Sequence, residues 1–173
     1  MSRAMRILSW NYQGLRNLWT VQSLHKLVRE QAPDVCFLME TRLDRSGFEK
    51  HCGDVPFKNK LIVKKPNSGG GLALLWKEKV TLDVINFTDN HILAKVVEND
   101  GFVWHLTRFY GWPEANEKRK SWALLSHLRT FVEVLGVALV ISMLYFMLRR
   151  NRVSMHLTLI RWRIFRLLWK IVS

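Results

Sequence analysis

Two polar side chains that follow apolar runs are the best candidates for chemistry in this sequence. Asn11 comes directly after the run at residues 7–10, and Glu40 comes directly after the run at residues 35–39. Both runs are rich in β-branched or bulky side chains, which is typical of buried strands. Because α/β folds place ligand-handling groups at the carboxyl ends of their strands, an amide and a carboxylate in these positions can share one ligand.

The segment between the two runs predicts how the strands pair. Thr20 can cap a helix, and Pro33 stops it. The apolar positions between these two residues recur at helical spacing: Val21, Leu24, Leu27 and Val28. A strand, a helix and a second strand in this order form a crossover with parallel strands. The sequence therefore predicts that the carboxyl ends of the two strands lie at one edge of a sheet.

The following segments predict a short helix and a hairpin. Asp44 can cap a helix that runs to Lys50. Residues 61–63 and 72–76 are expected to be the two strands of a hairpin, and the glycines at 69–71 are expected to form its turn. A phosphate-binding loop is disfavoured, because an apolar strand follows these glycines instead of Lys-Ser/Thr and a helix.

Three further strands and a helix complete the predicted body of the chain. Segments 81–87, 91–97 and 102–110 have the composition of strands, and the sequence Asn-Asp-Gly at 99–101 is a typical hairpin turn. Residues 117–128 carry apolar side chains three apart and predict an amphipathic helix. We therefore expect an antiparallel meander after the parallel start, in a protein of the α/β class.

Five short motifs follow one another along the chain: Ser9-Trp10-Asn11-x-Gln13-Gly14-Leu15, Phe37-Leu38-Met39-Glu40-Thr41, Gly69-Gly70-Gly71-Leu72-Ala73-Leu74-Leu75-Trp76, Asn90-His91-Ile92 and Phe109-Tyr110-Gly111-x-Pro113. In this order they resemble the amino-terminal half of an endonuclease/exonuclease/phosphatase domain. Within that superfamily they are most similar to the endonuclease of plant non-LTR (LINE-type) retrotransposons. The resemblance covers residues 5 to about 130 and implies a partial two-sheet α/β sandwich.

The resemblance also implies roles for four side chains. Glu40 would hold Mg²⁺, for which oxygen ligands are suited, and Asn11 would orient the site through hydrogen bonds. The hydroxyl of Tyr110 would contact the phosphate, and Gln13 stands at a possible second metal position, where the repair-enzyme branch has an Asp. The implied reaction is Mg²⁺-dependent hydrolysis of DNA, which in a full-length relative primes reverse transcription. No small-molecule substrate is indicated.

Glu40, Asn11 and Tyr110 also have purely structural interpretations. Glu40 could close its strand or pair with a lysine, and Asn11 could form an Asx-turn. Tyr110 could be a simple aromatic residue at the end of a strand. His91, from the fourth motif, is expected to order a loop.

The second half of the family's catalytic site has no counterpart in this chain. In the family, a Gly-Asp-Phe-Asn motif and a later Ser-Asp-His motif position the attacking water and stabilise the phosphate. Here no Asp or Glu follows Glu133, and His127 and His156 lack the flanking residues of those motifs. Because a metal carboxylate without a general base retains little of the rate, we expect a truncated domain at residues 1–130 whose nuclease activity is lost.

The net charge is the feature of the composition that bears most on function. The formal charge is +13, but residues 1–148 carry 20 basic and 14 acidic side chains, whereas residues 149–173 carry seven basic and no acidic ones. Such an excess favours nucleic acid or an anionic membrane surface as a partner.

The two cysteines imply neither a disulfide framework nor a zinc site. The first residues do not have the pattern of a secretory signal peptide. The family resemblance implies a location in the nucleus or the cytoplasm.

Residues 131–173 are expected to form a tail that is unrelated to the endonuclease-like domain. Its first part predicts an apolar helix, either a core helix or one that crosses a bilayer, through Val134, Leu135, Val137, Leu139, Val140, Ile141, Leu144, Phe146 and Leu148. Its second part predicts an amphipathic helix for an anionic membrane surface or for non-specific contact with nucleic acid. The basic residues of the tail are Arg149, Arg150, Arg152, Arg161, Arg163, Arg166 and Lys170. Besides a degenerate endonuclease domain, the sequence thus leaves open a small tail-anchored membrane protein and a non-specific basic nucleic-acid-binding module.

Overall fold

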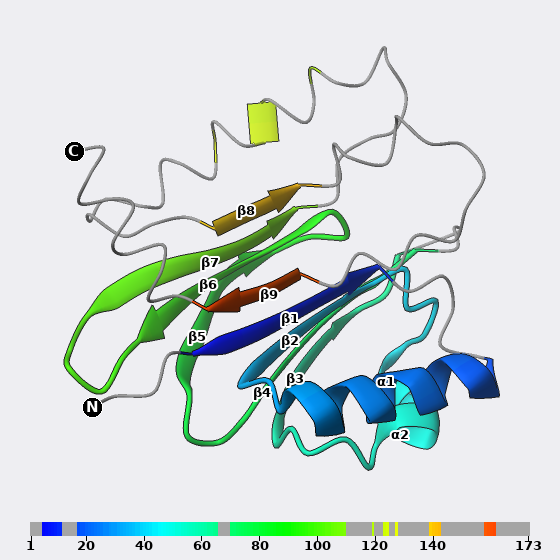
Figure 1. The fold of residues 1–173 in the computed structure, drawn as a ribbon. Helices are drawn as coiled ribbons and strands as arrows, with labels where there is room; N and C mark the ends of the chain where they lie inside the picture. The colour runs from blue at the N-terminus through cyan, green and yellow to red at the C-terminus, as the bar shows by residue number, and fades with distance from the viewer. Residues whose placement is uncertain are drawn as a thin grey trace. The chain divides into compact units, whose positions relative to one another are not determined.

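The computed structural model describes residues 5–11, 17–65 and 70–109, together with 119, 123–124, 127, 139–142 and 158–161. The chain divides into two compact units, one of residues 1–80 with 155–173 and the other of residues 81–154. Each unit holds one β-sheet (Figure 1). Two sheets with few helices confirm the α/β class predicted from the sequence.

The first unit is a five-stranded sheet with two helices. Its elements are β1 (Arg6–Asn11), α1 (Leu18–Gln31), β2 (Val35–Met39), α2 (Arg45–Cys52), β3 (Asn59–Val63), β4 (Leu72–Trp76) and β9 (Thr158–Arg161). The strands lie in the order β3-β4-β2-β1-β9. Strands β1 and β2 are parallel, and the other neighbouring pairs are antiparallel. The predicted crossover and the predicted β3–β4 hairpin are therefore confirmed.

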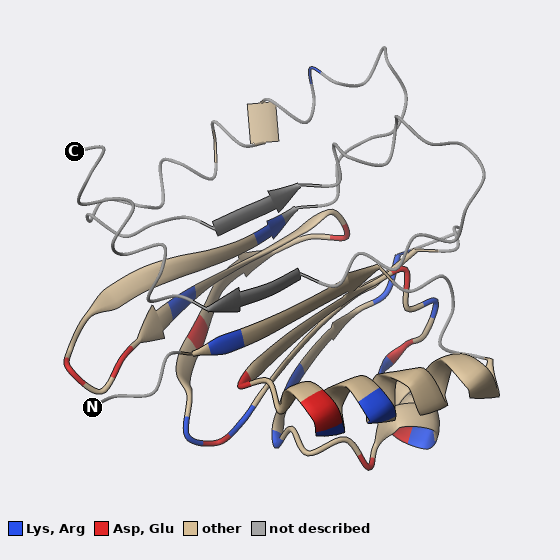
Figure 2. Ribbon diagram, viewed as in Figure 1, with Lys and Arg blue, Asp and Glu red and all other residues tan. Residues whose placement is uncertain are grey.

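Alternate side chains of the central strands build the core beside the helices. Leu8 and Trp10 of β1 and Leu38 of β2 belong to one buried cluster. Helix α1 contributes Leu24 and Val28 to this cluster, at two of the positions predicted from helical spacing. All five residues of β2 are buried, so both faces of this central strand are covered. Charged residues of this unit lie mainly on the helices and the connecting segments (Figure 2).

The predicted helix cap is confirmed for α2 and corrected for α1. The Asp44 carboxylate accepts a hydrogen bond from Gly47 N at 2.9 Å. Helix α1 begins earlier than predicted, because the side chain of Asn17, and not that of Thr20, accepts a hydrogen bond from Trp19 N at 3.1 Å. Asn and Thr are both good capping residues, so the local sequence is compatible with either start.

Both cysteines are buried free thiols. Cys36 lies in β2, and Cys52 ends α2 and packs in the core cluster. Burial raises the pKa of Cys52 to about 12, with the charge of Asp54 adding to the rise. Burial also raises the pKa of Cys36 far above its usual range. The two thiols therefore stay protonated and act as small apolar side chains.

The second unit is a four-stranded sheet. Its strands are β5 (Thr81–Phe87), β6 (His91–Val97), β7 (Val103–Phe109) and β8 (Leu139–Ser142), in the order β5-β6-β7-β8. The first three form the predicted antiparallel meander. The turn between β6 and β7 is the predicted one, with Gly101 at a φ of +79° and its N–H donating to Glu98 O at 2.9 Å.

The tail differs from the predicted helices wherever the structure describes it. Leu139, Val140 and Ile141, expected in an apolar helix, lie in β8, which pairs in parallel with β7. Arg161, expected in a basic helix, ends β9, which pairs with β1. Both short strands are rich in β-branched residues and cover strand edges that would otherwise be open. The remaining residues of the predicted membrane helix and basic tail lie outside the described residues. Within the described segments, no helix is both long and apolar enough to cross a membrane.

His91 orders the turn between β5 and β6, as predicted. Its Nδ1 lies 2.9 Å from Thr88 Oγ1, and its carbonyl oxygen accepts a hydrogen bond from Thr88 N at 2.9 Å. Burial lowers the pKa of His91, nearby His127 lowers it further, and Asp89 partly opposes both effects. The imidazole is therefore held in its neutral form.

Acidification is expected to destabilise the protein through His91. The pKa of His91 in the folded protein is lower than the ordinary value of about 6.5. The contribution of neutral His91 to the free energy of unfolding is therefore complete above about pH 6.5, and it is lost as the pH falls through the folded pKa. Thermal melts at about pH 7.5 and about pH 5 check this expectation. The variant His91→Gln should melt lower than the wild type at neutral pH but lose a few degrees less on acidification. Equal losses in the two proteins would contradict it, because His105, whose pKa burial also lowers, is present in both.

Candidate metal and nucleic-acid site

The carboxyl ends of β1 and β2 lie next to each other. The parallel register pairs Asn11 with Met39, the residue that precedes Glu40. Neighbouring strands are about 4.8 Å apart, so the backbone of Asn11 is one strand spacing from the end of the strand that carries Glu40. The shared sheet edge predicted from the sequence is thus present, while the chemical roles of the two side chains stay predictions.

Glu40 leaves β2 in a left-handed backbone conformation. The φ angle is 54° at Glu40 and 54° at Arg42. This conformation costs a non-glycine residue roughly 1–2 kcal/mol, and such strain is often found at functional sites. Glu40 is half-buried, whereas Leu38, two residues before it, is fully buried. The turn therefore ends the buried strand at the residue expected to bind the metal.

Asn11 ends β1 on the face opposite the helix-side core. Ser9 and Ile7 share this face, because side chains alternate along a strand and Leu8 and Trp10 belong to the core cluster. The Oδ1 atom of Asn11 is shielded from solvent although the residue as a whole is half-buried. An amide oxygen held away from bulk water is suited to orienting neighbouring groups by hydrogen bonds.

Two glycines before β4 brace the segment that follows Glu40. Thr41 N donates a hydrogen bond to Gly71 O at 3.4 Å, and Arg42 N donates one to Gly70 O at 3.0 Å. Gly71 has a φ of +126°, and a Cβ atom at this position would lie 2.8 Å from Thr41 Oγ1. Only glycine fits such a close approach. The glycines that the sequence explains as a hairpin turn therefore also fix the backbone beside Glu40.

The residues of this edge fit a magnesium ion that keeps part of its water shell. Mg²⁺ commonly binds to one or two carboxylates together with water and substrate phosphates, and Glu40 supplies one carboxylate at this edge. Among the described residues, no group of three or more His, Cys, Asp or Glu side chains could hold a metal ion. A magnesium ion here would therefore depend on water and phosphate oxygens. Gln13 and Tyr110, the other predicted site residues, lie outside the described residues.

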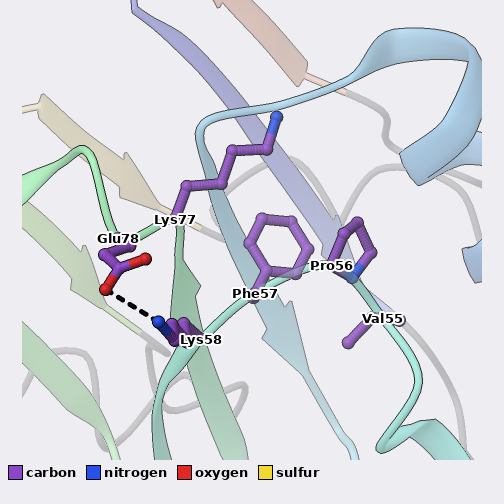
Figure 3. A pocket seen from close by; sticks show the side chains of 6 residues that line it. All are labelled: Val55, Pro56, Phe57, Lys58, Lys77 and Glu78. Carbon is purple, nitrogen blue, oxygen red and sulfur yellow. Dashed lines mark hydrogen bonds and ion pairs between the residues drawn. The ribbon is translucent and has the colours of Figure 1, made fainter.

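An open pocket of about 350 Å³ lies elsewhere in the first unit (Figure 3). Lys77 N, at the end of β4, donates to Asp34 O at 3.1 Å, so this part of the pocket is at the amino end of β2 and away from Glu40. The Lys58 ammonium and the Glu78 carboxylate form an ion pair of 2.8 Å across its rim. The pocket is lined by Val55, Pro56, Phe57, Lys58, Lys77 and Glu78. It is not part of the candidate metal site.

Solved structures with a similar fold include a catalytic domain, a protein bound to single-strand DNA and an endonuclease domain. The catalytic domain of human Nocturnin has a TM-score of 0.64 at 14% identity, with 81% of this chain and 63% of that chain covered. TDP2 from D. rerio, complexed with a single-strand DNA product, has a TM-score of 0.55 at 20% identity, with 82% and 60% covered. The endonuclease domain of TRAS1, a telomere-specific non-LTR retrotransposon, has a TM-score of 0.53 at 11% identity, with 73% and 53% covered. The chain thus spans less than two thirds of each of these three structures.

A sequence comparison with protein families gives a match over most of the chain. The search of curated proteins found no match to the sequence. The endonuclease/exonuclease/phosphatase family matches residues 8–141, a range that includes both Asn11 and Glu40 and extends past residue 130, where the sequence predicts a boundary. The chain therefore belongs to the endonuclease/exonuclease/phosphatase family.

Proposed function

We propose that this chain carries the metal-holding half of a DNA endonuclease site and derives from a non-LTR retrotransposon. The observation that supports this most directly is the parallel pairing of β1 and β2, which sets the end of Asn11's strand beside the segment with Glu40. Two similar structures support DNA as the partner: a TDP2 holding a single-strand DNA product and a retrotransposon endonuclease domain. The second of these also supports the proposed origin.

In this proposal each residue of the edge has one task. Glu40 holds Mg²⁺, which when bound neutralises charge on the phosphate. Asn11 orients neighbouring groups by hydrogen bonds. Gly70 and Gly71 hold the backbone after Glu40, so that the carboxylate stays in position without rearrangement on binding.

The chain by itself is expected to bind DNA without cutting it. No Asp or Glu follows Glu133, so the residues after that point supply no carboxylate to activate water. General-base catalysis contributes about 100-fold or more, and we expect nicking below that of an intact relative by at least this factor. A supercoiled plasmid incubated with the purified full chain and Mg²⁺ should stay uncut, while a gel-shift assay shows binding.

Four other outcomes of these assays are informative. Nicking that disappears in Glu40→Gln would contradict the predicted inactivity but support the site. Nicking that persists in that variant would point to a contaminating nuclease. DNA binding that falls steeply with salt and is unchanged by Glu40→Ala would favour a non-specific basic module, in line with the charge of residues 149–173. The absence of any DNA binding by the wild type would overturn the proposed function.

A further inference from the structure

The first turn of α1 exposes two large apolar side chains. Leu18 is 68% exposed and Trp19 is 77% exposed, and no other large apolar side chain in the described ranges is as exposed as either. The apolar residues later in the helix face the core cluster, so these two have no part in it. A tryptophan left almost entirely in water is a candidate for contact with a partner.

The backbone that carries Trp19 is fixed on both sides. Its N–H donates to the Asn17 side chain at 3.1 Å, and its carbonyl oxygen accepts from Ser23 Oγ at 2.8 Å. The carbonyl oxygen of Asn17 also accepts hydrogen bonds from Thr20 N at 3.0 Å and Val21 N at 3.1 Å. The indole ring is therefore presented from an ordered turn, and a partner can contact it without first ordering this backbone.

This turn lies at the same edge of the sheet as the candidate metal site. Only residues 12–16 separate Asn17 from Asn11, a link that spans at most about 22 Å. At its other end, α1 leads back to the amino end of β1, where Asp34 N donates to Arg6 O at 2.8 Å. The start of α1 and the arrowhead of β1 point to the same side of the unit in Figure 1. The first turn of α1, which carries Trp19, therefore lies toward the end of the sheet that carries Asn11 and Glu40.

The surroundings of Trp19 favour a polyanion with stackable rings over a lipid surface. The exposed face of α1 continues from Trp19 into Gln22, Lys26 and Arg29, so it has no apolar stripe to insert into a membrane. Later in the chain than Glu40, Arg45 at the start of α2 is exposed, and Lys64 after β3 is also exposed but forms an ion pair of 3.8 Å with Asp44. Proteins hold single strands with basic side chains for the phosphates and an aromatic ring for the bases, and Arg45 and Trp19 supply one group of each kind.

We propose that Trp19, with Leu18 beside it, is a stacking contact for an unpaired base of a nucleic-acid strand bound at the edge formed by Asn11 and Glu40. This inference rests on the proposed function, because it takes the strand held at the metal site as the source of the base. Trp19 contributes affinity for single-stranded segments and no chemistry. It gives the site a preference for DNA with unpaired bases over continuous duplex.

Fluorescence anisotropy of the full chain with a labelled oligothymidylate tests this inference. Loss of one base–aromatic stack is expected to weaken single-strand binding of Trp19→Ala roughly tenfold, while Trp19→Phe retains most of the affinity. Binding to the same strand annealed to its complement should change much less. The salt dependence should keep its slope, because no phosphate contact is removed. Phe87→Ala, which removes an exposed ring from β5 in the other unit, is the matched control and should bind as the wild type does.

The results separate this inference from the proposed function. Equal affinities of Trp19→Ala and the wild type for the single strand would overturn the stacking contact and leave the proposed function intact. No binding of either DNA by the wild type would overturn both. Loss of binding to anionic phospholipid vesicles in Trp19→Ala, with unchanged DNA binding, would show a membrane contact and also overturn the inference. Because Trp19 is largely exposed, an unchanged melting temperature is expected and confirms that the variant is folded.

Discussion

Replacing Glu40 with glutamine is expected to weaken Mn²⁺ binding by at least about tenfold while leaving the melting temperature nearly unchanged. The substitution removes the negative charge but keeps the length of the side chain. Mn²⁺ is a suitable probe, because it prefers carboxylate, carbonyl and water ligands as Mg²⁺ does. Electron paramagnetic resonance measures the free ion directly, so the readout does not depend on nuclease activity.

A second glutamate at the other end of the sheet provides the control. Glu78 pairs with Lys58 at the rim of the pocket, at the opposite end of β4 from the glycines that brace Glu40. Glu78→Gln should bind Mn²⁺ as the wild type does. Equal weakening in both variants would show only that general surface charge attracts the ion, and Glu40 would lose its assigned role.

Replacing Gly71 with alanine is expected to cost stability and metal affinity together. The positive φ disfavours alanine, and its Cβ would lie 2.8 Å from Thr41 Oγ1 and 3.2 Å from Val63 O. We expect a loss of about 3 kcal/mol, equivalent to a melting temperature lower by roughly 10 °C. Because Thr41 must move to relieve the clash, the adjacent Glu40 moves with it, and Mn²⁺ binding should weaken at temperatures where the variant is still folded.

Gly101 separates the backbone effect from the effect of crowding. It also has a positive φ, of +79°, but a Cβ atom there would meet nothing within 4 Å. Gly101→Ala should lose only about 1 kcal/mol and keep its Mn²⁺ affinity. If Gly71→Ala were no less stable than Gly101→Ala, the close packing of the glycine segment against Thr41 would not fix the position of Glu40.

Elements with regular local patterns could be predicted from the sequence. Two apolar runs predict the strands β1 and β2, and the helical spacing of Leu24 and Val28 predicts a helix between them. This order predicts parallel strands whose carboxyl ends lie at one edge of the sheet. Asn11 and Glu40 emerge as candidates from that reasoning, because each directly follows a buried run. The Asn-Asp-Gly turn likewise predicts the pairing of β6 with β7.

Features that depend on contacts between distant segments could not be predicted. An apolar stretch such as the one that contains Val140 is compatible with a helix or a strand. It forms the strand β8 because it pairs with β7, a contact between distant segments. The brace from Gly70 and Gly71 depends on the register that sets Met39 opposite Leu72. No local pattern encodes that register. The glycines directly before β4 are the only feature of the sequence that points to this contact, and they indicate an ordinary turn equally well.

The left-handed backbone of Glu40 also limits what evolution or design can do at this position. Glycine, asparagine and aspartate accept such a conformation most readily. Glycine has no oxygen to offer a cation, and the two short side chains carry theirs nearer to the main chain. A sequence optimised for folding alone would abandon glutamate here. In the proposed function, glutamate is kept at position 40 despite the conformational cost because its longer side chain carries the carboxylate farther from the main chain.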